Sequence, residues 1–268
     1  DIVIAKLNVN GNTLEASTFV GGTGNDGVNT AAGLKFNYAD EFRGEIDLDA
    51  NDNVYVVSST FSMNFPTLNA IQSSIGGLQD ACVFQLSSDL SQLNWSTYLG
   101  GSDDDSGFSL AEDNDGNIFV CGGTQSLNFP MGGNGYGQIF NGGNSDGWIA
   151  KLSPDGTTLL ASTYFGSNVF DQLYFIETDN ADEVFVYGQT RAANSTFVVN
   201  AVFSQPNSGM LVTKFPNDLS TIVWSTVFGT GDGKPSLSPT AFLVDVCGKI
   251  YLSGWGGAVN QYSTTEAG

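Results

Sequence analysis

The sequence predicts an all-β fold, and three observations lead to that prediction. Charged residues make up only 13% of the 268 residues, whereas glycine occurs 34 times. This balance is typical of many short strands joined by tight turns rather than of amphipathic helices. The third observation is that short, apolar, strand-like segments recur four times along the chain. We therefore expect a β protein built from repeats.

Two of the recurring segments keep a constant distance from each other. The first is Asp-Ile-Val-Ile-Ala-Lys-Leu at residues 1–7, which recurs at 80–86, at 146–152 and, more loosely, at 209–215. The second has the form Ser-Thr-aromatic-apolar-Gly and lies at residues 17–22, 96–101, 162–167 and 225–230. Both segments are offset by 79, 66 and 63 residues between successive copies. They therefore belong to one repeating unit.

A third segment is an acidic turn followed by a strand, at residues 49–56, 113–120, 179–186 and 245–252. In the first two units it leads into Asn64-Phe65-Pro66 and Asn128-Phe129-Pro130, where proline ends strand pairing. A unit of roughly 65 residues with about four short strands is typical of a propeller blade.

We predict a single β-propeller region over residues 1–268, built of four-stranded antiparallel blades. Its repeat units are approximately residues 1–79, 80–145, 146–208 and 209–268. The chain is expected to begin at the third strand of one blade and to end after the second strand of another. The four units are either a fragment of a larger propeller or close into a smaller one.

Together these segments resemble the seven-bladed β-propeller (SBBP) repeat family of bacterial surface and secreted proteins. Residues 245–257 also resemble segments of very large Bacteroidota surface proteins, which combine such repeats with gliding-associated C-terminal sorting domains. The chain departs from the family pattern because four units are fewer than seven blades, and because residues 33–44 form an insertion in the first unit.

The resemblance implies export across the outer membrane, through the type 9 secretion system, to the cell surface or the extracellular space. We expect a non-catalytic binding or structural module there, with a role in adhesion, gliding or spacing. The expected partners are other domains of the same long chain, glycans, cell-surface proteins or proteins of the secretion machinery.

The charge of the chain excludes some partners. Eight basic residues against 28 acidic ones give a net charge of −20, which repels a nucleic-acid backbone. No apolar run approaches the roughly 20 residues that a membrane-spanning helix needs, so we expect no membrane insertion. The three cysteines are expected to be buried free thiols.

Catalysis is not expected. The sequence contains no histidine, which excludes Ser-His and Cys-His nucleophile systems and histidine zinc sites. The alternative is a carbohydrate-active propeller enzyme, a glycosidase or lyase that uses a pair of carboxylates. That reading depends on the separation of two carboxylates in space, which the sequence does not give.

Two acidic turns are candidates for a calcium site, and no other cofactor is expected. Oxygen atoms of Asp and Asn at alternating positions can surround a hard cation. The candidates are Asp47, Asp49 and Asn51 in the first turn, and Asp113, Asp115 and Asn117 in the second. Neither turn completes a twelve-residue EF-hand loop. The alternative is a hairpin turn, which favours the same residue types.

Two further repeat positions carry structural predictions. Lys6, Lys151 and Lys214 share one position and are expected to form ion pairs with the carboxylates of the acidic turns. An aromatic residue recurs in the strand after each acidic turn, and core packing between blades is the expected role. These aromatic residues are Tyr55, Phe119, Phe185 and Tyr251.

Overall fold

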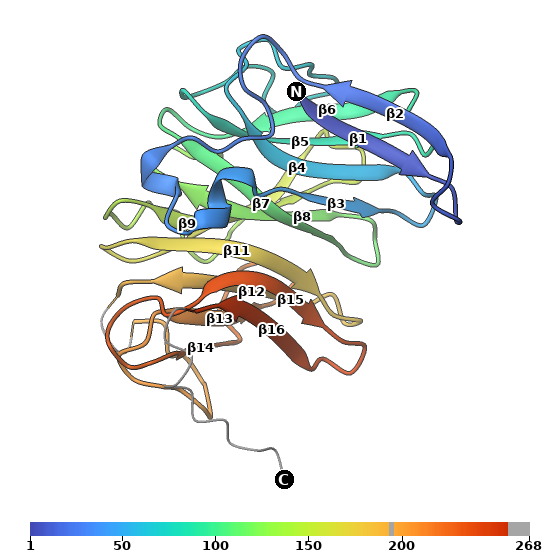
Figure 1. Ribbon diagram of the computed structural model, residues 1–268. Helices are drawn as coiled ribbons and strands as arrows, with labels where there is room; N and C mark the ends of the chain where they lie inside the picture. The colour runs from blue at the N-terminus through green and yellow to red at the C-terminus, as the bar shows by residue number, and fades with distance from the viewer. Residues whose placement is uncertain (193–195, 257–268) are drawn as a thin grey trace.

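The computed structural model describes residues 1–192 and 196–256 (Figure 1). Within these residues the chain is all-β, as predicted, with strands β1 to β16 in five antiparallel sheets. The other regular elements there are two short 3₁₀ helices. No helix of the described residues is long and apolar enough to cross a membrane.

Three sheets have four strands each, and we call them blades 1, 2 and 3. The strands of a blade pair antiparallel in chain order. Blade 1 contains β3 (Glu45–Leu48), β4 (Val54–Thr60), β5 (Asp80–Leu86) and β6 (Leu93–Leu99). Blade 2 contains β7 (Asp105–Glu112), β8 (Ile118–Thr124), β9 (Asp146–Leu152) and β10 (Leu159–Phe165). Blade 3 contains β11 (Asp171–Thr178), β12 (Val184–Thr190), β13 (Met210–Phe215) and β14 (Trp224–Phe228).

Two sheets have only two strands. The N half-blade contains β1 (Ile2–Leu7) and β2 (Leu14–Val20), and the C half-blade contains β15 (Ser238–Val244) and β16 (Ile250–Trp255). By sequence, β1 and β2 correspond to β5 and β6, the third and fourth strands of blade 1. The strands β15 and β16 correspond to the first and second strands of a blade. Among the described residues, β1 thus occupies the third position of a blade and β16 the second, as predicted, and each sequence repeat spans parts of two sheets.

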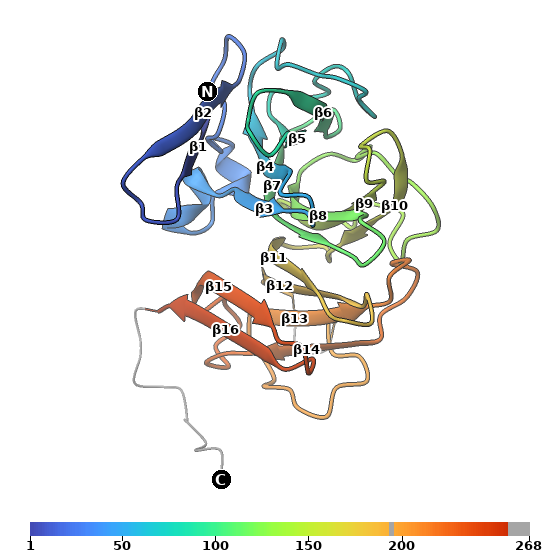
Figure 2. The same cartoon turned by 90° about the vertical axis from the view of Figure 1, so that its right-hand side faces the viewer.

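The five sheets lie side by side in chain order around an arc, with the two half-blades at its ends (Figure 2). The first strands of neighbouring sheets contact one another, β3 with β7, β7 with β11 and β11 with β15. A separate hydrophobic core fills each of the four spaces between adjacent sheets. Because a blade packs on both faces, its strands carry consecutive apolar residues. The predicted propeller blades are thus confirmed.

The aromatic position behaves as predicted in the complete blades. Tyr55, Phe119 and Phe185 are buried in the cores between sheets, whereas Tyr251 of the C half-blade is exposed. The prediction for the cysteines is partly wrong. Cys82 and Cys121 are buried, but Cys247 lies exposed in the turn between β15 and β16.

The insertion in the first unit begins earlier than predicted and interrupts the first strand of blade 1. Asp26 pairs with Thr60 at the end of β4, as Asp105 pairs with Thr124 in blade 2. Residues 27–44 then leave the sheet before β3 begins at Glu45. They contain the 3₁₀ helices η1 (Ala32–Leu34) and η2 (Tyr38–Phe42).

This insertion acts as a plug that connects sheets far apart in the sequence. Asn29 accepts a hydrogen bond of 3.0 Å from Gln79, beside blade 1. The side chain of Gln172 in blade 3 donates to the carbonyl of Leu34 at 2.9 Å. Asn29 and Leu34 are fully buried. The plug therefore contributes to the interior of the protein and is not a loose surface loop.

The end of the plug is fixed by Arg43. Its Nε donates to Asp40 at 2.8 Å, and its Nη2 donates to the carbonyl of Pro239 in the C half-blade at 2.6 Å. The guanidinium carbon lies 4.6 Å from the ring centre of Tyr174, a cation–π contact. Arg43 thus ties the plug to blade 3 and to the C half-blade.

Candidate functional site

The predicted lysine ion pairs form in blades 2 and 3. Lys151 Nζ lies 2.9 Å from Asp113 Oδ2, and both side chains are buried. Lys214 lies 3.5 Å from Asp179 and also contacts Glu183. Although burial alone would raise the pKa of Asp113, hydrogen bonds from Asn117, Asn217 and Lys151 bring it below its ordinary value. Lys6 of the N half-blade departs from the pattern, because its Nζ donates to the carbonyl of Ser88 at 3.1 Å.

The first calcium candidate has the geometry of a hairpin turn. Asp49 Oδ1 accepts the backbone N–H groups of Asn51 and Asn53, at 2.8 and 2.9 Å. Asp47 lies apart from these contacts on β3, where its Oδ1 accepts the N–H of Leu48. The structure therefore joins Asp49 and Asn51 in one turn and leaves Asp47 outside it.

The second calcium candidate has the same turn geometry. Asp113 Oδ1 accepts the N–H groups of Asp115 and Asn117, at 3.1 and 2.8 Å, and the side-chain amide of Asn117 at 3.0 Å. The Asp115 side chain is exposed. Among the described residues, no group of three or more His, Cys, Asp or Glu side chains is placed to hold a metal ion.

Sequence reasoning missed a second set of recurring carboxylates, which join consecutive blades. Asp105, the first residue of β7, accepts the N–H of Gly101 at 2.7 Å and the hydroxyl of Ser126 at 2.8 Å. Burial raises the pKa of Asp105 to about 7. Asp26 and Asp171 occupy the same position and accept equivalent N–H groups. The available signal was a Gly-Gly segment ending in Asp, at residues 21–26 and 100–105, which the sequence alone indicates only as a turn.

Two other carboxylates lie on the first strands of different blades. Glu45 on β3 accepts hydrogen bonds from the hydroxyl of Ser109 and from the N–H of Leu110, both on β7. Burial raises the pKa of Glu45. Burial, together with the charges of Glu45 and Asp47, raises the pKa of Glu177 on β11 to about 7. The influence of the Glu45 charge on Glu177 shows that these two carboxylates lie near each other.

A cleft lies on the face of the protein that carries long loops. Within blades 1 and 2, the second and third strands are joined by long loops at residues 61–79 and 125–145, whereas the first and second strands are joined by short turns. This cleft, of about 540 Å³, lies where the loop 125–145 meets the connection between β6 and β7, with Leu78 of the loop 61–79 beside them. Its lining residues are Leu78, Ser102, Asp103, Asp104, Gln125, Leu127, Phe140, Gly143 and Asn144.

Hydrogen bonds connect the segments that line this cleft. Asn128 Oδ1 accepts both the N–H and the hydroxyl of Ser102 at 2.9 Å. Gln125 donates its N–H to the Asp104 carbonyl and its side-chain amide to the Asn144 carbonyl, each at 2.9 Å. Burial, and to a smaller extent the charge of Asp103, raises the pKa of Asp104. These bonds hold the loop 125–145 against the connection between blades 1 and 2.

Exposed apolar side chains line the cleft together with acidic ones. Leu78 and Leu127 are 78% and 72% exposed. Asp103 is exposed and Asp104 is half-buried. A surface that combines apolar groups with carboxylates and amides can bind a ligand with both carbon faces and hydroxyl groups.

Comparison with known families supports the architecture. Residues 94–130 match the family model of the SBBP beta-propeller repeat. The chain carries this repeat. The matched segment begins at β6, crosses β7 and β8 and ends at Pro130, so the SBBP repeat includes the joint between blades 1 and 2 as well as the Asn-Phe-Pro segment. A search of curated proteins finds no significant match to the chain.

Proposed function

We propose that this chain is a non-catalytic binding or structural β-propeller module of a secreted or cell-surface bacterial protein. The observation that carries the proposal is the cleft lined by residues 102–104, the loop 125–145 and Leu78, where Leu78 and Leu127 are exposed. Propellers present such loops on a fixed frame, so loop sequence can determine the partner without altering the blades.

The ligand class that fits this cleft best is a neutral or cationic glycan. Leucine side chains can pack against the carbon faces of sugar rings, while Asp103, Asp104 and Gln125 can hydrogen-bond hydroxyl groups. The net charge of −20 disfavours anionic ligands and nucleic acids. Other domains of the same long chain, surface proteins or secretion proteins are the remaining partners.

The resemblance of the repeat units to surface proteins supports an extracellular location, after export across the outer membrane by the type 9 system. Adhesion, gliding and spacing are the roles that such a location allows. No cofactor is part of this proposal.

Binding of the purified chain to a glycan array, followed by calorimetry with the best glycan, tests the proposal. The double variant Asp103→Asn/Leu127→Ser should weaken binding by about tenfold or more, because it removes one polar and one apolar contact. The matched control is Asp89→Asn/Leu160→Ser, which changes the same residue types outside the cleft and should bind like the wild type. Absence of binding to any glycan, or equal loss in both variants, would contradict the proposal.

The second candidate function is a carbohydrate-active enzyme, and the raised pKa of Glu177, which lies near Glu45, favours it. A carboxylic acid with a pKa of about 7 can act as a proton donor near neutral pH. Release of reducing sugar from a glycan, abolished by Glu177→Gln and retained in Glu183→Gln, would replace the binding proposal by this one. We expect no such release.

A further inference from the structure

The cleft at the joint between blades 1 and 2 carries two adjacent carboxylates, Asp103 and Asp104. Within the described residues, no Lys or Arg lines this cleft, and neither carboxylate forms an ion pair. Burial, and to a smaller extent the charge of Asp104, also raises the pKa of the neighbouring Asp80 to about 6. The negative charge of the cleft is therefore not neutralised by the described part of the chain.

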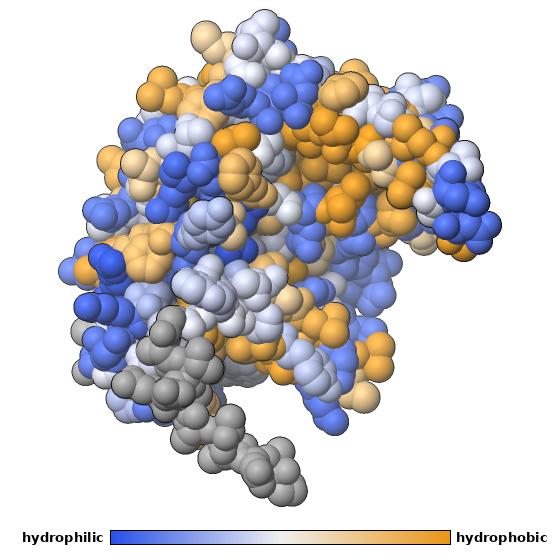
Figure 3. Space-filling view, viewed as in Figure 1, coloured by the Kyte–Doolittle hydropathy of each residue, from blue (hydrophilic) through white to orange (hydrophobic). Residues whose placement is uncertain are grey.

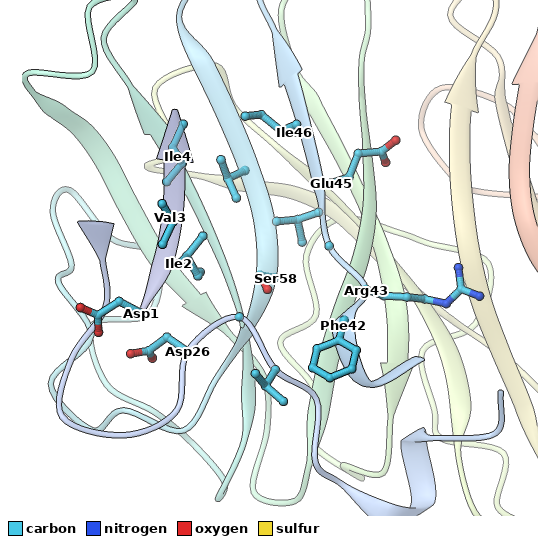
Figure 4. Close-up of a pocket in the computed structure, with 15 residues that line it drawn as sticks. Asp1, Ile2, Val3, Ile4, Asp26, Phe42, Arg43, Glu45, Ile46 and Ser58 are labelled. Atoms are coloured by element: carbon cyan, nitrogen blue, oxygen red, sulfur yellow. The ribbon is translucent and has the colours of Figure 1, made fainter. Parts of the chain in front are cut away.

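Two other hollows that contain carboxylates also contain a basic side chain. They lie beside β1, where hydrophobic residues gather over β1, β2 and β3 (Figure 3). In the hollow of about 390 Å³, Arg43 lies with Glu45 on the side opposite Asp1 and Asp26 (Figure 4). The hollow of about 300 Å³ includes Lys6. The cleft between blades 1 and 2 differs from both in having acidic side chains alone.

The repeat shows that the fold does not require a carboxylate at position 103. The equivalent residue at the joint between the N half-blade and blade 1 is Gly24, whose N–H donates to Ser62 Oγ at 2.8 Å. The N–H of Asp103 donates to Ser126 Oγ at 2.9 Å in the same way. Because the backbone makes this contact, the side chain of Asp103 is free for another role.

Position 104 leads to the same conclusion. At three joints, a backbone carbonyl accepts the N–H of the residue that follows the second strand of the next blade, at 2.9 Å. These carbonyls belong to Asn25, Asp104 and Phe170, and their donors are Phe61, Gln125 and Arg191. Neutral residues therefore serve the frame at the other two joints, and the acidic pair is particular to this cleft.

The cleft offers hydrogen-bond acceptors more than donors. The N–H and the hydroxyl of Ser102 both donate to Asn128, and the backbone and side-chain N–H groups of Gln125 donate to Asp104 and Asn144. The carboxylate of Asp103 is exposed. A ligand that carries positive charge and donates hydrogen bonds matches this lining, because charge-assisted hydrogen bonds to a carboxylate are the stronger kind.

We propose that the ligand of this cleft is a cationic glycan whose sugars carry free amino groups, with an ammonium group paired to Asp103 and Asp104. This inference rests on the glycan-binding function proposed above and selects the cationic class. In an N-acetylated sugar, a neutral amide replaces the ammonium group and adds a carbonyl acceptor. That group cannot form the ion pair, and its carbonyl meets a lining that consists mainly of acceptors.

An amino sugar fits the cleft better than a lysine side chain of a protein partner. One rigid ring holds the ammonium group, hydroxyl donors and a carbon face, and the exposed Leu78 and Leu127 can cover that face. A lysine side chain offers the charge alone and loses more conformational freedom when it binds.

The test compares two tetramers of equal length, one of β-1,4-linked glucosamine and one of N-acetylglucosamine. Binding to the purified chain is measured by calorimetry at about pH 6, where the amino groups carry their protons, in about 150 mM salt. We expect the amino tetramer to bind at least about tenfold more tightly, since it adds a charge-assisted hydrogen bond. Asp103→Asn and Asp104→Asn should each remove most of this preference, and Asp103→Glu should keep it.

The matched control is Asp89→Asn, which removes the same charge in the turn between β5 and β6 and should keep the full preference. Equal loss in this control would assign the preference to the net charge of the chain and overturn the proposal. Tetralysine that binds as tightly as the amino tetramer, and loses binding in Asp103→Asn, would identify a cationic protein segment as the partner and also overturn it.

The glycan-binding function and this inference can fail separately. If the N-acetylated tetramer binds as tightly as the amino form, or if neither tetramer binds while a glycan of the array does, the ammonium pairing is wrong and glycan binding stands. If no glycan binds at all, both are wrong.

Discussion

The hydroxyl of Tyr164 accepts the backbone N–H of Phe129 at 2.8 Å and donates to the carbonyl of Ser126 at 2.9 Å. The two rings also meet edge to face, with centres 6.2 Å apart. Tyr164 belongs to the Ser-Thr-aromatic segment and Phe129 to the Asn-Phe-Pro segment, so the structure couples two separate elements of the repeat. Tyr98 and Phe65 make the same contact in blade 1.

Blade 3 lacks both partners of this contact. Val227 stands at the tyrosine position on β14, and the loop before β13 contains no Asn-Phe-Pro segment. The tyrosine and the tripeptide are therefore present together in blades 1 and 2 and absent together in blade 3. The physical reason is that the tyrosine hydroxyl forms hydrogen bonds with the backbone of the loop that carries the tripeptide, so each element loses its partner when the other is absent.

Replacing Tyr164 by Phe should destabilise blade 2 and loosen its loop. The change leaves the buried N–H of Phe129 and the carbonyl of Ser126 without their partner, which costs about 1–2 kcal/mol. We expect a corresponding fall in the free energy of unfolding by denaturant, and faster amide exchange at Phe129. Tyr136→Phe, on an exposed ring, is the control and should change neither quantity. Normal exchange at Phe129 in Tyr164→Phe would refute this coupling.

Removing the charge of Lys151 should cost more stability than removing that of a surface lysine. Lys151→Met leaves the buried Asp113 carboxylate without its ion-pair partner, and breaking such a pair costs about 3 kcal/mol. Lys35 lies 3.9 Å from Glu41 in a more exposed pair, so Lys35→Met should cost less than about 1 kcal/mol. Denaturant unfolding of both variants measures the difference. Equal costs would show that the buried pair contributes no more than a surface contact.

Stability should decrease as the pH rises from about 4 to 7. Burial raises the pKa of Asp105 from 3.8 to about 7 and that of Asp171 to about 6. The folded state therefore binds more protons than the unfolded state in this range, so deprotonation favours unfolding. We expect a higher melting temperature at pH 5 than at pH 8. Asp105→Asn should narrow this difference, and the exposed substitution Asp89→Asn should leave it unchanged. If both variants keep the full difference in melting temperature between pH 5 and pH 8, the protonation of Asp105 does not cause it.

Calcium should have little effect on this protein. The oxygens of Asp113 already accept hydrogen bonds from its own turn and from Lys151 and Asn217, which a cation would have to displace. We expect the melting temperature to change by less than about 1 °C between excess calcium and excess chelator, because a ligand that binds the folded state raises it. A rise that depends on calcium concentration and disappears in Asp49→Asn or Asp113→Asn would instead establish the calcium site.

The sequence by itself determined the repeats, the all-β class and the positions that β1 and β16 occupy within a blade. These follow from local patterns, because strand periodicity, turn residues and proline act over a few positions. It also indicated the partners of Lys151 and Lys214, since residues at equivalent repeat positions meet equivalent neighbours. The exposure of Cys247 was available from the repeat, because Cys247 lies in the fourth acidic turn, at the position that the exposed Asp115 occupies in the second.

Only the tertiary structure decided what the insertion does and where the carboxylates meet. Nothing local in residues 27–44 indicates that Asn29 reaches Gln79 or that Arg43 reaches Pro239, because those partners come from sheets distant in the sequence. The neighbourhood of Glu45 and Glu177 likewise depends on how the first strands of three blades lie together. A repeat determines contacts inside a blade and between adjacent blades, whereas a unique insertion and the centre of the fold depend on the packing of all the sheets.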